Sequence, residues 1–360
     1  MRQCQWLVSP ALALVLTLAT FQQAGAESLV RKSAGVMAFG PDGVLFVADA
    51  KTATIFAIET GDVTKTDARP NVSNVDQLIA KALGTKADEI AIVDMAVNPA
   101  SNAVYFSVSR GLGADATPVL VRVSPQGDIT EVDSDSVKFT KAELPNPPED
   151  ALVGQGRRRK NNRTESITDI EYQNGKLHVA GLSNEEFAST FRSIPYPFSK
   201  VTKGAAVEIY HASHNAVETG APIRTFTTYT IAEQPHLLAG YTCTPLVKIP
   251  LDELNDGQKV RGVTVAELGN RNRPLDMFVY NKGGEDFILM ANSNRGLMKI
   301  STKDIDRETG LTERVADRAG QEYETVVESG VEQLDRLGDK HAAMLIKTDK
   351  GFDLVTRELP

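Results

Sequence analysis

Cysteine is nearly absent from this sequence. Among 360 residues there are two, Cys4 and Cys243. We expect the first 26 residues to be removed as a leader, for the reasons given below. The mature chain then keeps one thiol, Cys243, which excludes an internal disulfide. A lone thiol in an oxidising compartment is either buried and inert or retained for its chemistry. Within the stretch QPHLLAGYTCTPLVKIP, Cys243 lies in the expected loop between two strands and is a candidate catalytic nucleophile or soft metal ligand.

An excess of basic residues and long apolar segments are also absent. The formal net charge of −8 argues against a nucleic-acid partner, because phosphate binding needs a basic face. Residues 7–21 form an apolar run of 15 residues, too short for a stable membrane span, and Ala24-Gly25-Ala26 follows it. We therefore expect a signal peptide over residues 1–26, no membrane span, and a mature chain of residues 27–360 exported to a periplasm or outside the cell.

Common catalytic signatures are missing too. The sequence has no glycine-rich phosphate loop, no Gly-x-Ser-x-Gly and no His-Glu-x-x-His. Histidines are few: His211 and His214 are three residues apart, and in an extended strand they point to opposite faces unless a turn intervenes. With His236 and Cys243 they form an alternative Zn²⁺ or Cu site, since imidazole and thiolate suit those metals.

What the sequence does contain is a degenerate repeat. Each copy reads as strand, turn, strand, loop and strand, often with a fourth strand after it. The copies occupy residues 36–58, 94–123, 169–194, 223–249, 276–300 and 331–359. One small antiparallel sheet cannot bury both of its faces, whereas sheets arranged radially cover one another. The repeat thus predicts an all-β protein, a β-propeller of six four-stranded antiparallel blades, with seven blades as the alternative.

The whole of residues 27–360 is predicted to be one propeller domain. Two inserts, at residues 68–88 and 140–165, interrupt the repeat. The last copy lacks a fourth strand of its own. We expect the N-terminal residues 28–32 to supply that strand and close the ring.

The first copy carries a resemblance to a known superfamily. Phe39-Gly-Pro-Asp-Gly43 and Leu45-Phe-Val-Ala-Asp49 resemble repeats of the six-bladed propellers that include NHL, SMP-30/gluconolactonase and TolB-like proteins. The resemblance is one of fold. Lactonase-type members hold one divalent cation at the channel mouth, and the resemblance implies such a cation here, without a full ligand set that matches position by position.

Four copies place an aspartate near the innermost strand: Asp94, Asp169, Asp276 and Asp335. Carboxylates that converge on one axis repel unless a cation or arginines compensate for their charge. Hard oxygen ligands suit Ca²⁺ first. We predict that Asp94, Asp169, Asp276 and His236 hold this cation. The alternative is that each aspartate bonds to local backbone.

A second polar constellation spans residues 267–295. Its arginines suit an anionic ligand, because guanidinium binds carboxylate or phosphate through two parallel hydrogen bonds. The predicted ligand-binding residues are Arg271, Asn272, Arg273, Asn292, Asn294 and Tyr241. Cys243, Asp276 and Arg295 are the predicted catalytic residues. The alternative for this stretch is that its polar groups satisfy the backbone of adjoining blades.

These observations favour a site at one mouth of the channel and leave three functions open. The first is a metal-assisted lactone or ester hydrolase, in which a cation polarises a carbonyl and activates water. The second is a non-catalytic propeller that binds a small molecule, an anion or a partner protein. The third is a His/Cys transition-metal protein.

Overall fold

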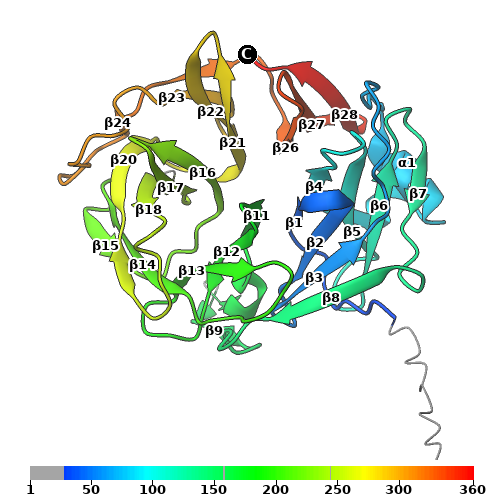
Figure 1. Cartoon of the computed structure of the whole chain (residues 1–360), viewed down its shortest axis with the longest axis horizontal. Helices are drawn as coiled ribbons and strands as arrows, with labels where there is room; N and C mark the ends of the chain where they lie inside the picture. Colours follow the sequence, from blue (N-terminus) through cyan, green and yellow to red (C-terminus); the bar gives the residue numbers. More distant parts are fainter. Residues whose placement is uncertain (1–27, 157–158, 244) are drawn as a thin grey trace, which may run out of the picture.

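The chain forms a propeller of six mainly antiparallel β-sheets around a central axis (Figure 1). The computed structural model describes residues 28–156, 159–243 and 245–360, so the predicted leader lies outside the described residues. The predicted fold class, an all-β six-bladed propeller built from small antiparallel sheets, is confirmed. The described part of the chain holds one α-helix, α1 (Val75–Ala82), and no helix that is long and apolar enough to cross a membrane.

The blades are lettered here in the chain order of their innermost strands. Blade A contains β1 (Met37–Phe39), β2 (Val44–Asp49), β3 (Thr54–Glu59) and β8 (Lys138–Glu143). Blade B contains β4 (Ile90–Val97), β5 (Val104–Arg110), β6 (Thr117–Val123) and β7 (Ile129–Glu131). Blade C contains β11 (Asp169–Gln173), β12 (Lys176–Leu182), β13 (Ser189–Pro195) and β14 (Ala205–His211), with β15 (Ala216–Glu218) and β19 (Lys259–Arg261) paired to β14.

The other three blades follow the same plan. Blade D contains β16 (Thr225–Ile231), β17 (Gln234–Gly240), β18 (Pro245–Pro250), β20 (Val263–Leu268) and β24 (Arg318–Gly320). Blade E contains β21 (Pro274–Lys282), β22 (Glu285–Asn292), β23 (Gly296–Ser301) and β25 (Tyr323–Val326). Blade F contains β26 (Val331–Leu337), β27 (His341–Thr348) and β28 (Gly351–Glu358).

The turn of the first copy shows how the repeat makes its strands. Pro41, Asp42 and Gly43 form a short 3₁₀ turn between β1 and β2. Asp42 and Gly43 have φ angles of 53° and 71°, a left-handed conformation that glycine adopts without strain and aspartate tolerates. The turn returns β2 antiparallel to β1, and all six residues of β2 are buried between blades.

The order of blades around the ring differs from their order along the chain. β1 lies between β4 and β11, and β26 lies beside β4 (Figure 1). The ring therefore runs B, A, C, D, E, F and back to B. The physical reason is the pairing of β8 with β3: the chain leaves blade A after three strands, builds blade B, and then returns to complete blade A. The repeat carries no sign of this order.

The segment between β3 and α1 crosses blade B and closes the ring. Asp62 receives hydrogen bonds from Tyr105 Oη at 3.1 Å and Arg122 Nε at 2.7 Å, both of blade B. Further along, the backbones of Val72 and Leu354 exchange two hydrogen bonds of 2.8 and 2.9 Å at the outer edge of blade F. Asp76 Oδ1 then accepts from the backbone N–H of Phe352 at 2.9 Å.

This arrangement corrects the predicted closure. Residues 28–32 do not form a strand and do not pair with blade F. Their backbone instead follows blade A, where Lys32 N–H donates to Asp49 Oδ2 at 2.6 Å. The position beside β28 is occupied by the segment around Val72, whose route across blade B delivers it to that edge.

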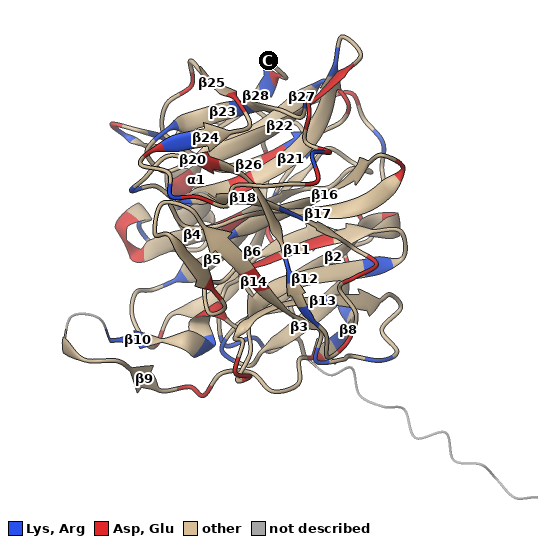
Figure 2. Ribbon diagram, turned by 90° about the vertical axis from the view of Figure 1, so that its left-hand side faces the viewer, with Lys and Arg blue, Asp and Glu red and all other residues tan. Residues whose placement is uncertain are grey.

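The two predicted inserts also have defined places. Residues 68–88 hold the closing segment and α1, whose buried face includes Val75 and Ile79. Residues 140–165 begin within β8, so the first part of that stretch belongs to blade A. The remainder includes the short strands β9 (Leu152–Val153) and β10 (Lys160–Asn161), which pair as an arm that extends from the body (Figure 2).

The closing contact predicts the effect of one substitution. Asp76→Ala removes the acceptor of the Phe352 N–H bond, so we expect it to lower the free energy of unfolding by about 1–3 kcal/mol. Urea denaturation followed by far-UV circular dichroism measures this change. Asp88→Ala, which removes an exposed carboxylate of the same connection, serves as the control and is expected to leave the midpoint unchanged. Equal midpoints for the two variants would contradict the closing role.

Candidate functional site

The innermost strands of all six blades surround a cavity of about 540 Å³ on the propeller axis. Asp94, Asp169, Asp276 and Asp335 all line it, so the convergence that the repeat predicts for these four side chains is observed. Glu171, two residues further along β11 on the same face, lines it as well and had no signal in the sequence analysis. His236 is not among the lining residues.

Each of the four aspartates bonds to the backbone of the next blade in the ring. The acceptor is Oδ2 in every case, and the donors are Met37 N for Asp94 (2.6 Å), Phe226 N for Asp169 (2.7 Å), Leu334 N for Asp276 (2.7 Å) and Val97 N for Asp335 (2.7 Å). All four bonds run in the same sense around the axis. They thus join blade B to A, C to D, E to F and F to B.

Glu171 adds a second bond between blades C and D. Its Oε2 accepts from Thr228 N at 2.9 Å, and its Oε1 accepts from Thr228 Oγ1 at 2.9 Å. This joint therefore has two carboxylates on β11, one above the other along the channel. The alternative interpretation of the aspartates, as acceptors for backbone, accounts for one oxygen of Asp94 and of Asp276. It accounts for both oxygens of Asp169 and Asp335, whose Oδ1 atoms also accept from the N–H of the following residue.

Burial governs the protonation of these carboxylates. It raises the pKa of Asp169 to about 7, that of Glu171 to about 7 and that of Asp335 to about 6. Burial also raises the pKa of Asp94 and of Asp276 well above the usual value, and their neighbouring carboxylates add to the effect. The backbone N–H bonds act in the opposite direction on every one of the four aspartates. Near neutral pH the channel carboxyls are therefore incompletely ionised.

The predicted polar constellation of residues 267–295 is brought together by two neighbouring loops. Asn292 Nδ2 donates to Asn272 Oδ1 at 3.3 Å, and Asn292 Oδ1 accepts from the backbone N–H groups of Asn294 and Arg295 at 3.1 Å each. Asn294 Nδ2 donates to the carbonyl of Arg271. These asparagines hold the loops to one another, and their role toward a ligand stays a prediction.

The arginines of that stretch have different surroundings. Arg273 as a whole residue is exposed. Partial desolvation of its guanidinium lowers its pKa, and the positive charge of the nearby Arg224 lowers it further. Arg295 Nη2 lies 3.6 Å from Asp317 Oδ1. Arg224 of blade D, absent from the sequence predictions, forms an ion pair with Glu165 at 2.7 Å. None of these arginines lines the channel cavity, whose one basic lining residue among those described is Arg336.

Cys243 and Tyr241 follow β17. The Cys243 backbone N–H donates to Asn272 O at 2.8 Å, and the residue has a φ of 63°. Tyr241 is buried, which raises the pKa of its hydroxyl. His236 Nδ1 contacts Gln234 O at 2.8 Å within the same strand. The catalytic role of Cys243, Asp276 and Arg295 stays a prediction.

The described residues contain one group of three or more His, Cys, Asp or Glu side chains whose donor atoms lie within 4.8 Å of one another. That group is His211, His214 and Glu218. It includes two of the histidines in the alternative transition-metal site, and in place of His236 and Cys243 it has a carboxylate. The channel carboxylates are spaced more widely than this.

Comparisons with known proteins assign this chain to no family. No protein-family model matches the chain, and no curated protein does. Similar solved structures include a glucose dehydrogenase-like oxidoreductase from Thermus thermophilus, with 12% identity, coverage of 92% of this chain and 99% of that chain, and a TM-score of 0.32. A PQQ-bound aldose sugar dehydrogenase from Streptomyces coelicolor has 12% identity, coverage of 93% and 97%, and a TM-score of 0.30. The WD40 propeller domain of Doa1 has 7% identity, coverage of 93% and 96%, and a TM-score of 0.31. At these values no function is transferred.

The raised pKa values predict how stability depends on pH. A carboxyl whose pKa is higher in the folded chain than in the unfolded chain contributes stability at low pH and loses it as pH rises through the folded pKa. For Asp169 this window extends from about 4, the unfolded value, to about 7. Asp169→Asn keeps an acceptor for Phe226 N–H and removes the titration. We therefore expect the free energy of unfolding of the variant, minus that of the unmodified chain, to be larger at pH 7.5 than at pH 4.5.

Urea denaturation at the two pH values measures this difference. Asp67→Asn, at an exposed aspartate, is the matched control and is expected to follow the unmodified chain at both. A pH-independent effect of Asp169→Asn would show that Asp169 titrates normally in the folded protein.

Proposed function

We propose that the channel of this propeller binds a small organic cation that carries more than one ammonium group. The observation that supports this proposal is the charge of the cavity lining. Six carboxylates line it, Asp94, Asp169, Glu171, Asp276, Asp335 and Asp339, against one guanidinium, Arg336. A cation among them relieves the mutual repulsion that burial intensifies.

The spacing of the carboxylates favours an organic cation over a bare metal ion. Direct ligands of Ca²⁺ lie about 2.3–2.6 Å from the ion, so the donor atoms of one site fall within about 5 Å of each other. The channel carboxylates do not form a group that meets a limit of 4.8 Å in the described chain. A cavity of about 540 Å³ is in the range that accommodates a small molecule, whose separate N–H donors can reach carboxylates on different blades.

This spacing also bears on the other functions considered. A lactone or ester hydrolase of the kind predicted from the sequence needs a cation held directly by channel carboxylates, so binding is the better-supported proposal for the channel. The divalent cation itself fits the His211, His214 and Glu218 group better than the channel, because there the donor atoms are close enough. An anionic ligand remains a prediction for the loops that carry Arg271 and Arg273. We further propose that binding takes place outside the cytoplasm, as the leader expected at residues 1–26 implies.

Calorimetry with a matched pair of ligands tests the proposal. Hexamethylenediamine is expected to bind at low ionic strength, and hexanediol, of similar length and uncharged, is expected not to bind. The double variant Asp169→Asn/Glu171→Gln should weaken diamine binding by at least about tenfold, which corresponds to about 1.4 kcal/mol. Asp67→Asn is the control and should bind as the unmodified chain does.

The pH dependence of binding gives a second readout. Because the pKa values of Asp169, Glu171 and Asp335 are about 7, 7 and 6, diamine binding is expected to weaken from pH 8 to pH 5.5 and to release protons near neutral pH. Equal affinity for the diol and the diamine, or no binding of the diamine at millimolar concentration, would overturn the proposal.

A further inference from the structure

A second polar cluster lies away from the channel lining, on a hairpin at the outer side of blade C. His211 ends β14, His214 is in the turn that follows, and Glu218 ends β15. The turn is closed by hydrogen bonds from His214 N to His211 O at 3.1 Å and from Asn215 N to Ala212 O at 3.2 Å. Asn215 has a φ of 53°, a conformation that asparagine tolerates well. In an extended strand, His211 and His214 would point to opposite faces. This turn brings the two side chains together.

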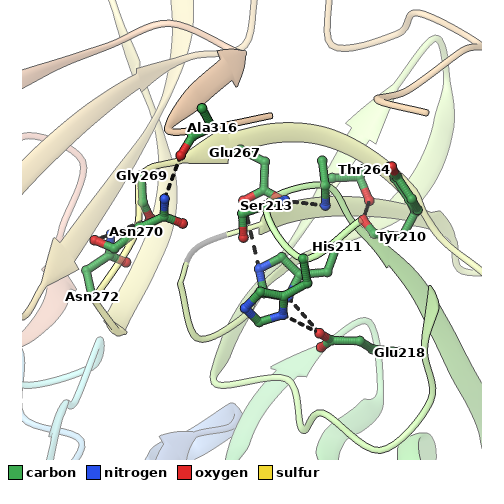
Figure 3. Close-up of polar contacts among 12 residues, drawn as sticks. Tyr210, His211, Ser213, Glu218, Thr264, Glu267, Gly269, Asn270, Asn272 and Ala316 are labelled. Carbon is green, nitrogen blue, oxygen red and sulfur yellow. Dashed lines mark hydrogen bonds and ion pairs between the residues drawn. The ribbon is translucent and has the colours of Figure 1, made fainter. Parts of the chain in front are cut away.

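The two imidazoles share one carboxylate oxygen (Figure 3). Glu218 Oε1 lies 3.0 Å from His211 Nδ1 and 2.7 Å from His214 Nδ1. The two rings are 3.8 Å apart between centroids. Three donor atoms thus converge on one small volume. His211 is buried, whereas about half of the His214 side chain (53%) is exposed, so the cluster is open to solvent on one side.

A carboxylate of the next blade supports the hairpin from behind. Glu267 of β20 accepts from Ala212 N at 2.7 Å and from Ser213 N at 3.3 Å through Oε1 (Figure 3). Its other oxygen lies 4.0 Å from His211 Nε2. The Glu267 side chain is fully buried, and it belongs to blade D, so it fixes the hairpin of blade C against its neighbour.

Several buried polar atoms around this cluster have no hydrogen-bond partner. They include His211 Nε2, Ser213 Oγ and Glu267 Oε2. Buried donors and acceptors without partners are uncommon, and each calls for a group that completes it. Both His211 Nε2 and Glu267 Oε2 would be satisfied if the imidazole carried its proton on Nε2 and donated it to the carboxylate after a small closure of the 4.0 Å gap.

In that tautomer His211 Nδ1 carries no proton, and its lone pair faces His214 and Glu218. Two imidazole nitrogens and one carboxylate oxygen are ligands that Zn²⁺ and similar divalent ions prefer, whereas Ca²⁺ and Mg²⁺ prefer oxygen alone. A tetrahedral ion with ligand distances of about 2.0–2.2 Å holds its donor atoms about 3.4 Å from one another. The observed separations of 3.0 and 2.7 Å are slightly shorter, so a small outward movement of the side chains admits the ion. A ligating histidine whose other nitrogen donates to a carboxylate is the usual arrangement around such metals.

We propose that His211 Nδ1, His214 Nδ1 and Glu218 Oε1 bind one divalent transition-metal ion of the Zn²⁺ class, and that Glu267 is a positioning residue that orients His211. The three protein ligands leave a fourth position on the solvent side, beside His214. This site is independent of the channel, because none of its residues lines the channel cavity.

Zinc titration of the full chain tests the site. After dialysis against a chelator, calorimetry with Zn²⁺ is expected to show one ion per chain, with Ca²⁺ unable to compete. His214→Ala and Glu218→Gln should each weaken binding by at least about a hundredfold, and His341→Ala, at a histidine of blade F, should leave it unchanged. Glu267→Gln should keep one ion per chain and weaken its binding by about ten- to a hundredfold.

A spectroscopic measurement separates a built site from adventitious binding. Electron paramagnetic resonance of the Cu²⁺-loaded chain is expected to show hyperfine splitting from two imidazole nitrogens, reduced to one in His214→Ala. Circular dichroism of the unloaded His214→Ala variant should match that of the unmodified chain, since the side chain is half exposed. No stoichiometric Zn²⁺ binding, or binding that survives both His214→Ala and Glu218→Gln, would overturn the proposed metal site. Either result would leave the proposal of a channel ligand standing, because the two sites share no residue.

Discussion

The hydrogen bond from a backbone N–H of one innermost strand to an aspartate of the neighbouring strand is the contact on which this propeller depends. An innermost strand is the edge of its sheet, and its axial N–H groups have no strand to pair with. Buried backbone donors need an acceptor. Asp94, Asp169, Asp276 and Asp335 supply one at four of the six blade junctions, all in the same sense around the ring.

The same contact determines the chemistry of the channel. Each junction uses one carboxylate oxygen and brings a whole ionisable group close to the axis. Burial then raises the pKa values, and the protein retains protons near neutral pH instead of full negative charge. A structural device thus produces a cavity that favours cations. Glu171 increases this effect, because it adds a second carboxylate at the junction that Asp169 already joins.

The blades and the four aspartates were predictable from the sequence, because each depends on a pattern of residues close together in the chain. A strand–turn–strand pattern such as that around Pro41 and Gly43 specifies one hairpin, and an aspartate at the same point of four copies implies a common axis. The blade order was not predictable in this way. It depends on β8 pairing back to β3 and on Asp62 contacting blade B, both of which are contacts between residues distant in the chain. The His211 cluster was missed as a set because its carboxylates, Glu218 and Glu267, come from a short hairpin and from another blade.

The crossing segment explains why ring closure and the unusual blade order go together. After β3, the chain passes across blade B, bonds to the edge of blade F through Val72, and only then enters blade B through α1. The seam between blades F and B is therefore covered by one continuous connection, and Asp335 bonds the same two blades at the axis. Because the segment contacts both blades, it fixes their separation from the outside while the aspartate fixes it from the inside.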